Sequence, residues 1–143
     1  MANRPGPEMG VIRDETGTQR LLGYVLDVGG DDRRARCSLD LDDRHLNRQD
    51  ILHGGIAATL LDNAMGATAS LSVDDTGRHP FTTLALTVNY LAPGRPGQVQ
   101  AIGRITGGGS STLFVDGELR HQDGTLIATA TGVFRKSRPP EAR

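Results

Sequence analysis

Asp62 is a single carboxylate in the middle of an apolar, small-sided stretch that covers residues 52–69. This stretch predicts a helix over about residues 54–72, with alanine or glycine at many positions. A carboxylate on a helix without a broad polar face is costly unless it is paired or used in chemistry. Asp62 is therefore the first candidate for a catalytic residue, and the alternative is a buried structural cap or an ion-pair partner.

The predicted helix begins directly after His53 with two glycines, Gly54 and Gly55. Glycines at a helix start leave the backbone N–H groups uncovered, and the positive end of the helix dipole lies at the same place. Such a start can bind a developing oxyanion. His53 itself either holds the loop at the helix start or acts as a base, and we favour the structural interpretation.

The composition argues for one ordinary domain. We expect a flexible segment over residues 1–15, a single domain over 16–136 and a flexible tail over 137–143 of the 143 residues. A net charge of −1 argues against a nucleic-acid or membrane-surface protein. The first ten residues lack the apolar core of a secretory signal. The lone cysteine, Cys37, excludes an internal disulfide, fits a cytoplasmic location, and is expected to be a small buried hydrophobe.

Strand patterns flank the single long helix on both sides. We expect a hairpin from residues 21–28 and 35–41, a polar loop over 42–50, and four later strands as an antiparallel meander, over residues 81–91, 98–106, 112–120 and 125–135. In the first of these four, alternation puts Leu84, Leu86, Val88 and Tyr90 on one face and Thr83 on the other. A single helix must pack against a sheet of five or six strands. The fold class is therefore α+β, with a curved sheet wrapped around one long central helix.

The spacing of three residues carries a resemblance to a known family. Asn47 lies six residues before His53, and Asp62 lies nine residues after it. The segments TVNYLAPGRPGQ and GTLIATATGVF follow in the expected order. Over roughly residues 20–136 the chain resembles the hotdog-fold acyl-CoA thioesterases of the PaaI type, within the 4-hydroxybenzoyl-CoA thioesterase-like superfamily. The resemblance implies a hydrolase that converts an acyl- or aryl-CoA thioester to the free acid and CoA.

The same resemblance implies roles for individual residues. The Gly54 amide would polarise the thioester carbonyl, and Asp62 would act as general base or as nucleophile through an anhydride. Asn47 would bind the carbonyl or the water, unless it is an ordinary turn residue. Thr83 would lie near the catalytic water, unless it is a simple strand threonine. Where some relatives carry a hydroxyl residue one turn after the acid, this chain has Gly66.

Gly54 and Asp62 are too far apart to act on one carbonyl within one chain. Eight residues of helix separate them by roughly 12 Å along the axis. Two antiparallel helices from two subunits could bring them together, and the small residues of the helix would allow close approach. The resemblance implies a homodimer of this kind, or a homotetramer made of two such dimers.

Contacts with CoA are expected at Gly55, at Gly109, Ser110 and Ser111, and at Arg135. The Gly-rich run could equally be a plain turn, and Arg135 could belong to a basic tail. We expect no cofactor, with CoA present only as part of the substrate. The four histidines show no metal-ligand spacing. One rival is a hotdog hydratase, which should show a catalytic His–acid pair. Another is a non-catalytic acyl-CoA-binding protein, against which the presence of Asp62 argues.

Overall fold

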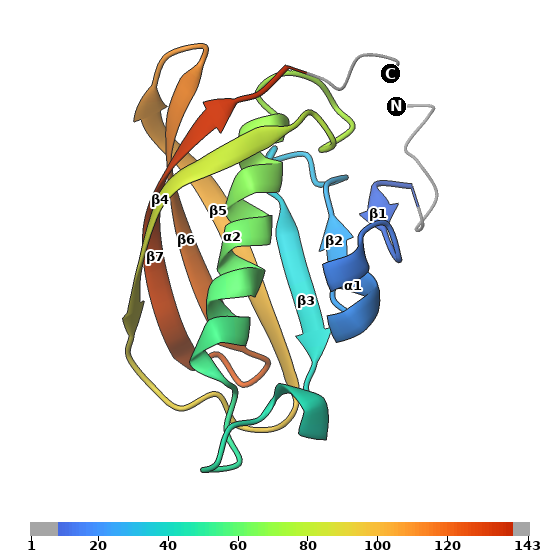
Figure 1. Ribbon diagram of the computed structural model, residues 1–143, viewed down its shortest axis with the longest axis vertical. Coiled ribbons are helices and arrows are strands. Elements are labelled where there is room, and N and C mark those ends of the chain that lie inside the picture. The colour runs from blue at the N-terminus through green and yellow to red at the C-terminus, as the bar shows by residue number, and fades with distance from the viewer. Residues whose placement is uncertain (1–8, 139–143) are drawn as a thin grey trace.

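A long helix, α2 (Gly54–Ser70), lies inside a curved seven-stranded antiparallel sheet (Figure 1). The computed structural model describes residues 9–138. The strands are β1 (Val11–Ile12), β2 (Val25–Asp27), β3 (Arg36–Asp40), β4 (Phe81–Tyr90), β5 (Gln98–Gly108), β6 (Thr112–His121) and β7 (Leu126–Lys136). A short helix, α1 (Gly17–Leu22), and a 3₁₀ turn, η1 (Asp43–His45), complete the fold. The predicted α+β architecture is confirmed, but the sheet has seven strands instead of the expected five or six, because β1 was not expected. Within the described range, no helix is long and apolar enough to cross a membrane.

The strand order is β1-β2-β3-β5-β6-β7-β4, so the predicted meander of the last four strands is wrong. β4 lies at the edge beside β7 instead of beside β5. The chain between β4 and β5 crosses below the start of α2 (Figure 1). Two backbone hydrogen bonds hold this crossing: Leu52 N–H donates to Gly94 O at 2.7 Å, and Leu41 N–H donates to Gly97 O at 3.0 Å. The crossing segment leads from the β4 edge of the sheet to its middle, where β5 pairs with β3.

The first predicted strand overlaps a helix at its start, because residues 21–22 belong to α1. Thr16 caps α1 by accepting the N–H of Gln19, and Gly23 ends the helix in the left-handed region, at φ 85°. These local caps prevent residues 21–22 from continuing the strand, and β2 begins only at Val25. The strand β1 lies inside the segment expected to be flexible and pairs with β2. Two residues are too few to produce an alternating pattern, which is why the sequence did not reveal β1.

β7 ends at Lys136. The next residue, Ser137, is the first of the segment expected to be a flexible tail, and its N–H donates to Pro80 O at 2.9 Å, beside the start of β4. The rest of the predicted tail and most of the predicted N-terminal segment, residues 139–143 and 1–8, lie outside the described residues.

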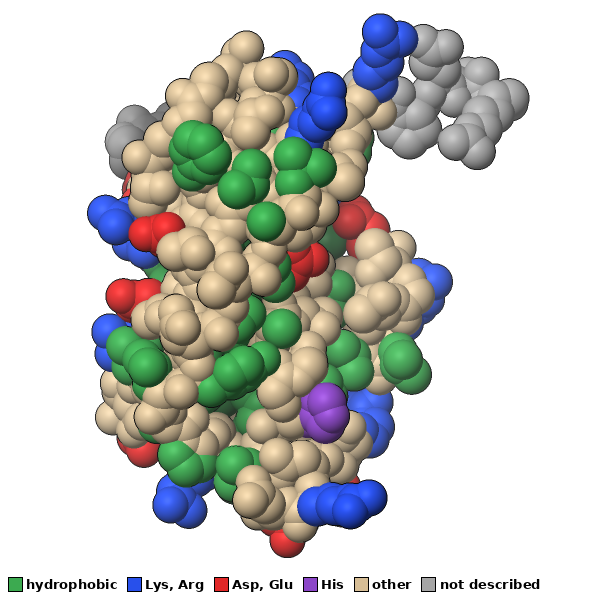
Figure 2. All heavy atoms as spheres, turned by 60° about the vertical axis from the view of Figure 1, so that its left-hand side comes forward, with side chains coloured by type: hydrophobic (Ala, Val, Ile, Leu, Met, Phe, Trp, Pro, Cys, Tyr) green, Lys and Arg blue, Asp and Glu red, His purple; other side chains and the backbone are tan. Residues whose placement is uncertain are grey.

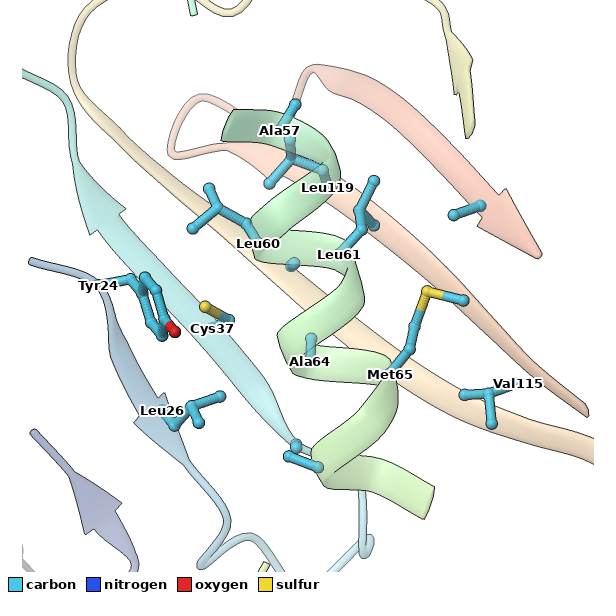
Figure 3. Close-up of a cluster of buried hydrophobic side chains, with 14 of the residues drawn as sticks. Tyr24, Leu26, Cys37, Ala57, Leu60, Leu61, Ala64, Met65, Val115 and Leu119 are labelled. Carbon is cyan, nitrogen blue, oxygen red and sulfur yellow. The ribbon is translucent and has the colours of Figure 1, made fainter. Parts of the chain in front are cut away.

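The core lies between α2 and the concave face of the sheet (Figure 3). Leu60, Leu61 and Met65 on α2 are fully buried, together with Val115 and Leu119 on β6. The helix approaches the sheet closely at Gly103, where a Cβ would lie 2.9 Å from the backbone oxygen of Ala64 on α2. Burial also raises the pKa of the Cys37 thiol, which is fully buried, so the expectation of a small buried hydrophobe is confirmed.

A bulge in β4 reverses one predicted face. Thr83 pairs with Phe134 and Ala85 pairs with Val133, so Leu84 is an extra residue in β4. Leu84 is 55% exposed. Because of this extra residue, Thr83 points to the helix side of the sheet, as Leu86 does further along β4, which corrects the predicted alternation.

Candidate active site

Asp62 and Thr83 form one half of the candidate site. The Thr83 hydroxyl donates to Asp62 Oδ1 at 2.6 Å, and this contact joins the middle of α2 to the start of β4. The second carboxylate oxygen, Oδ2, accepts no hydrogen bond from residues 9–138. No Lys, Arg or His in this range forms an ion pair with Asp62, so the ion-pair alternative gains no support. Asp62 is half-buried, with one oxygen oriented and the other open to react.

The start of α2 forms the other half. His53 is the N-cap: its Nδ1 accepts the Gly55 N–H at 2.9 Å. The N–H groups of Ile56 and Ala57 both donate to His53 O at 3.0 Å. Of the first four N–H groups of the helix, that of Gly54 alone has no acceptor in the described chain. This contact pattern leaves Gly54 as the donor for an external oxygen, and it supports the structural interpretation of His53.

Tyr90, the last residue of β4, covers Gly54 from the sheet side. Its hydroxyl donates to Gly54 O at 2.6 Å. A Cβ built on Gly54 would lie 3.4 Å from the tyrosine ring, so the two residues are in close contact. No sequence motif assigned Tyr90 a role. The available signal was its position on the same face as Leu86 and Val88, as one of two tyrosines in the chain.

Asn47 lies in the loop before α2. Its side-chain oxygen accepts the N–H of Gln49 at 2.8 Å and that of Ile51 at 3.4 Å, which closes the loop as a turn. These bonds support the turn interpretation for the oxygen. The side-chain amide nitrogen donates to no acceptor among residues 9–138, so it stays available to a ligand at the Gly54 end of the helix.

The residues expected to contact CoA separate into two places. Gly55 lies at the start of α2, and His53 occupies its N–H. Gly109, Ser110 and Ser111 form the turn between β5 and β6, where Gly109 N–H donates to Thr112 O at 2.8 Å. This turn contacts β7, because Lys136 N–H donates to Ser111 O at 2.7 Å.

Arg135 on β7 is exposed and pairs in register with Thr82. It therefore lies one residue along from Thr83, at the Asp62 end of the site. The turn between β5 and β6 lies at this same end of the sheet, since Thr112 also pairs with Arg135.

One chain does not bring the two halves together. β4 runs antiparallel to α2, with Thr83 beside Asp62 and Tyr90 beside Gly54. The helical rise separates Gly54 from Asp62 by roughly 12 Å along the axis. Each half has its own donors and acceptors, and a substrate carbonyl cannot reach both within one chain.

Tyr24 is a buried residue that contacts α2 at Asn63, the residue after Asp62. Burial raises the pKa of Tyr24, and the negative charge of Asp62 adds to this effect. The Tyr24 hydroxyl donates to Asn63 Oδ1 at 3.1 Å, beside Asp62 in the chain. In the part of the chain that the structure describes, no three His, Cys, Asp or Glu side chains form a group that could hold a metal ion.

A single helix enclosed by a curved antiparallel sheet, with a His-Gly-Gly start and an acid eight residues after the first glycine, defines a protein of the hotdog class. Residues 49–128, more than half of the chain, match the thioesterase superfamily. The chain belongs to this superfamily.

Named relatives and solved structures agree with this assignment. Human acyl-coenzyme A thioesterase 13 is 27% identical over 112 residues, which cover 77% of this chain and 78% of that protein. The BH2602 protein of Bacillus halodurans, solved with CoA, superposes with a TM-score of 0.78 at 28% identity and covers 90% of this chain and 83% of its own. The PaaI protein of Escherichia coli shares the fold, with a TM-score of 0.72 at 20% identity and 87% of each chain covered.

Proposed function

We propose that this protein is an acyl-CoA thioesterase that hydrolyses an acyl- or aryl-CoA thioester to the free acid and CoA. The observation that carries the proposal is the pair of complementary half-sites. Asp62 offers an oriented carboxylate with one open oxygen, and Gly54 offers the free N–H at the helix start. The names of the relatives support the substrate class, as does the CoA bound to BH2602.

The chemistry needs a polarised carbonyl and a group that drives attack on its carbon. The Gly54 N–H and the positive end of α2 stabilise the negative charge that develops on the thioester oxygen. Asp62 Oδ2 accepts a proton from water as the new C–O bond forms, and the C–S bond then breaks to release the CoA thiolate, which takes up a proton. Direct attack by Asp62 through an anhydride is the second route.

Supporting roles follow from the contacts. The Thr83 hydroxyl orients Asp62, and its oxygen can still accept a hydrogen bond from the attacking water. The Asn47 amide nitrogen donates to the carbonyl or the water. His53 caps the helix and so keeps Gly54 in place. No metal or redox cofactor is required for this reaction, and CoA enters only as part of the substrate.

We further propose that the active unit is a homodimer. β4 is a ten-residue edge strand paired on one side with β7, and long open edges are normally covered. A two-fold axis beside β4 would set two α2 helices antiparallel, with Gly54 of one subunit against Asp62 of the other. Such an arrangement removes the roughly 12 Å separation that disables one chain.

Pairing of two dimers into a homotetramer is proposed from the outer face of the sheet. Hydrophobic side chains are visible on the β4 side of the molecule (Figure 2). Among the large hydrophobic residues, Leu84 on β4 is 55% exposed and Phe114 on β6 is 48% exposed. Burial of these side chains between dimers would be favourable.

The CoA moiety is proposed to lie at the Asp62 end. Gly109, Ser110 and Ser111 would contact the pantetheine arm, and Arg135 would meet a phosphate. Gly55 would contact the substrate near the thioester. We place the protein in the cytoplasm, where its acyl-CoA substrates are found and a single buried thiol, Cys37, is compatible with reducing conditions.

The first test replaces the acid. Asp62→Asn should abolish hydrolysis across a panel of short, medium, long and aryl acyl-CoA substrates, while calorimetry still detects acyl-CoA binding. Asp116→Asn, on the outer face of β6, is the matched control and should keep wild-type turnover. Near-normal turnover by Asp62→Asn would overturn the mechanism. Binding without hydrolysis by the wild-type protein would favour the alternative, a non-catalytic acyl-CoA-binding protein.

The second test mixes two inactive chains, Gly54→Pro and Asp62→Asn. Half of the randomly formed dimers combine both variants, and each of these contains one intact site out of two, so about a quarter of wild-type activity should return. Each variant alone should remain inactive. No recovery in verified heterodimers would exclude a site shared between subunits.

A further inference from the structure

We propose that Tyr90 is a positioning residue that orients the Gly54 N–H for the thioester oxygen. The proposal rests on the proposed function, because it assigns a residue to the same half-site. It is carried by the contacts of Tyr90 with Gly54: a hydroxyl hydrogen bond of 2.6 Å to the carbonyl, and a ring that would lie 3.4 Å from a Cβ on Gly54.

The helix start needs such a support because two consecutive glycines form it. Glycine has the widest backbone freedom of all residues, and helix ends fray. The Gly54 N–H lies in the peptide plane between residues 53 and 54. The plane between residues 54 and 55 restrains this N–H through the φ and ψ angles of Gly54. Each plane is rigid, so a bond to any of its atoms helps to fix it.

The first plane, between residues 53 and 54, is held by its carbonyl. His53 O accepts the N–H groups of both Ile56 and Ala57 at 3.0 Å. The Gly54 N–H points away from that carbonyl across the trans peptide bond, so it faces outward from the helix. This plane is held from one side alone, because the N–H itself is left for the ligand.

The second plane, between residues 54 and 55, is held at both ends. Tyr90 donates to Gly54 O, and the Gly55 N–H donates to His53 Nδ1 at 2.9 Å. These bonds form a chain through one peptide group, and each polarises the next. Loss of the Tyr90 hydroxyl would leave the flexible Gly54 with one tether fewer on this side.

Tyr90 also links the two halves of the site through β4. The start of this strand places Thr83 against Asp62, and its last residue places Tyr90 against Gly54. Any shift of β4 at the subunit edge would move both half-sites together. Tyr90 itself is 55% exposed, so its hydroxyl serves a surface contact rather than the core.

Tyr90→Phe tests the role because it keeps the ring and removes the hydroxyl. We expect kcat to fall about tenfold with KM changed by less than about twofold, since a misplaced Gly54 N–H stabilises the transition state less while substrate binding stays nearly the same. Amide hydrogen exchange at Gly55, measured by NMR, should become faster. Ser72→Ala is the control: it removes another hydroxyl that donates to a backbone carbonyl, Ala69 O, beyond the far end of α2, and should leave both readouts unchanged.

The outcomes separate this inference from the proposed function. Wild-type kcat and Gly55 exchange in Tyr90→Phe would overturn the positioning role, while hydrolysis by the wild-type protein would still support a thioesterase. If the wild-type chain hydrolyses no acyl-CoA, the proposed function fails. The contact between Tyr90 and Gly54 is then tested by Gly55 amide exchange alone. Faster Gly55 exchange in Tyr90→Phe but not in Ser72→Ala would support the contact between Tyr90 and Gly54 as a restraint on the helix start, and Gly55 exchange equal to that of the wild type would reject it.

Discussion

The Thr83 hydroxyl reaches Asp62 Oδ1, at 2.6 Å, because Leu84 bulges out of β4. Regular alternation from Leu86, Val88 and Tyr90 would place Thr83 on the opposite face of the sheet. The extra residue shifts the alternation of side chains along β4 by one position, so Thr83 faces the helix. An irregularity in one edge strand thereby creates a contact of the candidate site.

Thr83→Val should lower kcat about tenfold, because it removes the donor that orients Asp62 while it keeps the size and branching of the side chain. Thr83→Ser retains a hydroxyl and should keep most of the activity. Steady-state kinetics with one good acyl-CoA substrate would measure both. Equal activity of the Val and Ser variants would show that the hydroxyl has no part in turnover.

Deletion of Leu84 should remove the bulge and leave Thr83 directly before Ala85, still opposite Phe134 and still on the helix side of the sheet. We therefore expect a folded protein, by circular dichroism, with activity well above that of Thr83→Val. Leu84→Ala is the control, since it shortens the same side chain but keeps the extra residue and the bulge. Activity as low as that of Thr83→Val in the deletion variant would contradict the assignment of Leu84 as the extra residue.

Gly103→Ala should destabilise the protein by about 2–3 kcal/mol through overpacking between β5 and α2. A Cβ there would lie 2.4 Å from Thr68 Oγ1 and 2.9 Å from Ala64 O. Gly109→Ala is the matched control, because a Cβ at that residue meets nothing within 4 Å, and its stability should change by less than about 0.5 kcal/mol. Urea unfolding monitored by circular dichroism gives both values. Similar stability of the two variants would disprove the tight contact.

Asp32 should make a small pH-dependent contribution to stability. The Arg36 guanidinium, which forms a 2.7 Å ion pair with this carboxyl, lowers the pKa of Asp32 to about 2. Because the folded pKa is depressed, the stabilisation is complete above the unfolded value near 4 and is lost as the pH falls through 2. The pair is largely exposed, so solvent screening limits the effect to about 0.5–1 kcal/mol.

The experiment compares the wild type with Asp32→Asn by urea unfolding at pH 6 and at pH 2. The variant should be less stable at pH 6, and most of the difference should be lost at pH 2. Added salt at pH 6 should narrow the difference too, because it screens an exposed pair. A difference that stays constant with pH would show that the charge of Asp32 contributes nothing.

Local patterns determined the central elements of this protein. The apolar run after His53 predicted α2, which begins at Gly54 as expected and ends two residues early, at Ser70. Alternation predicted β5, β6 and β7 to within about two residues, because the period of side chains along a half-buried strand is a local property. Asp62 was also evident, since a carboxylate in an apolar helix contrasts with its own neighbours.

Tertiary structure alone decided which elements pair and which contacts form. The place of β4 beside β7, and the bulge at Leu84, result from packing between segments far apart in the chain, which no local period records. The availability of the Gly54 N–H is a similar case. The sequence placed a glycine at the helix start, but the positions of His53 Nδ1 and His53 O determine which N–H remains free, because hydrogen bonds depend on distance and angle in the folded chain.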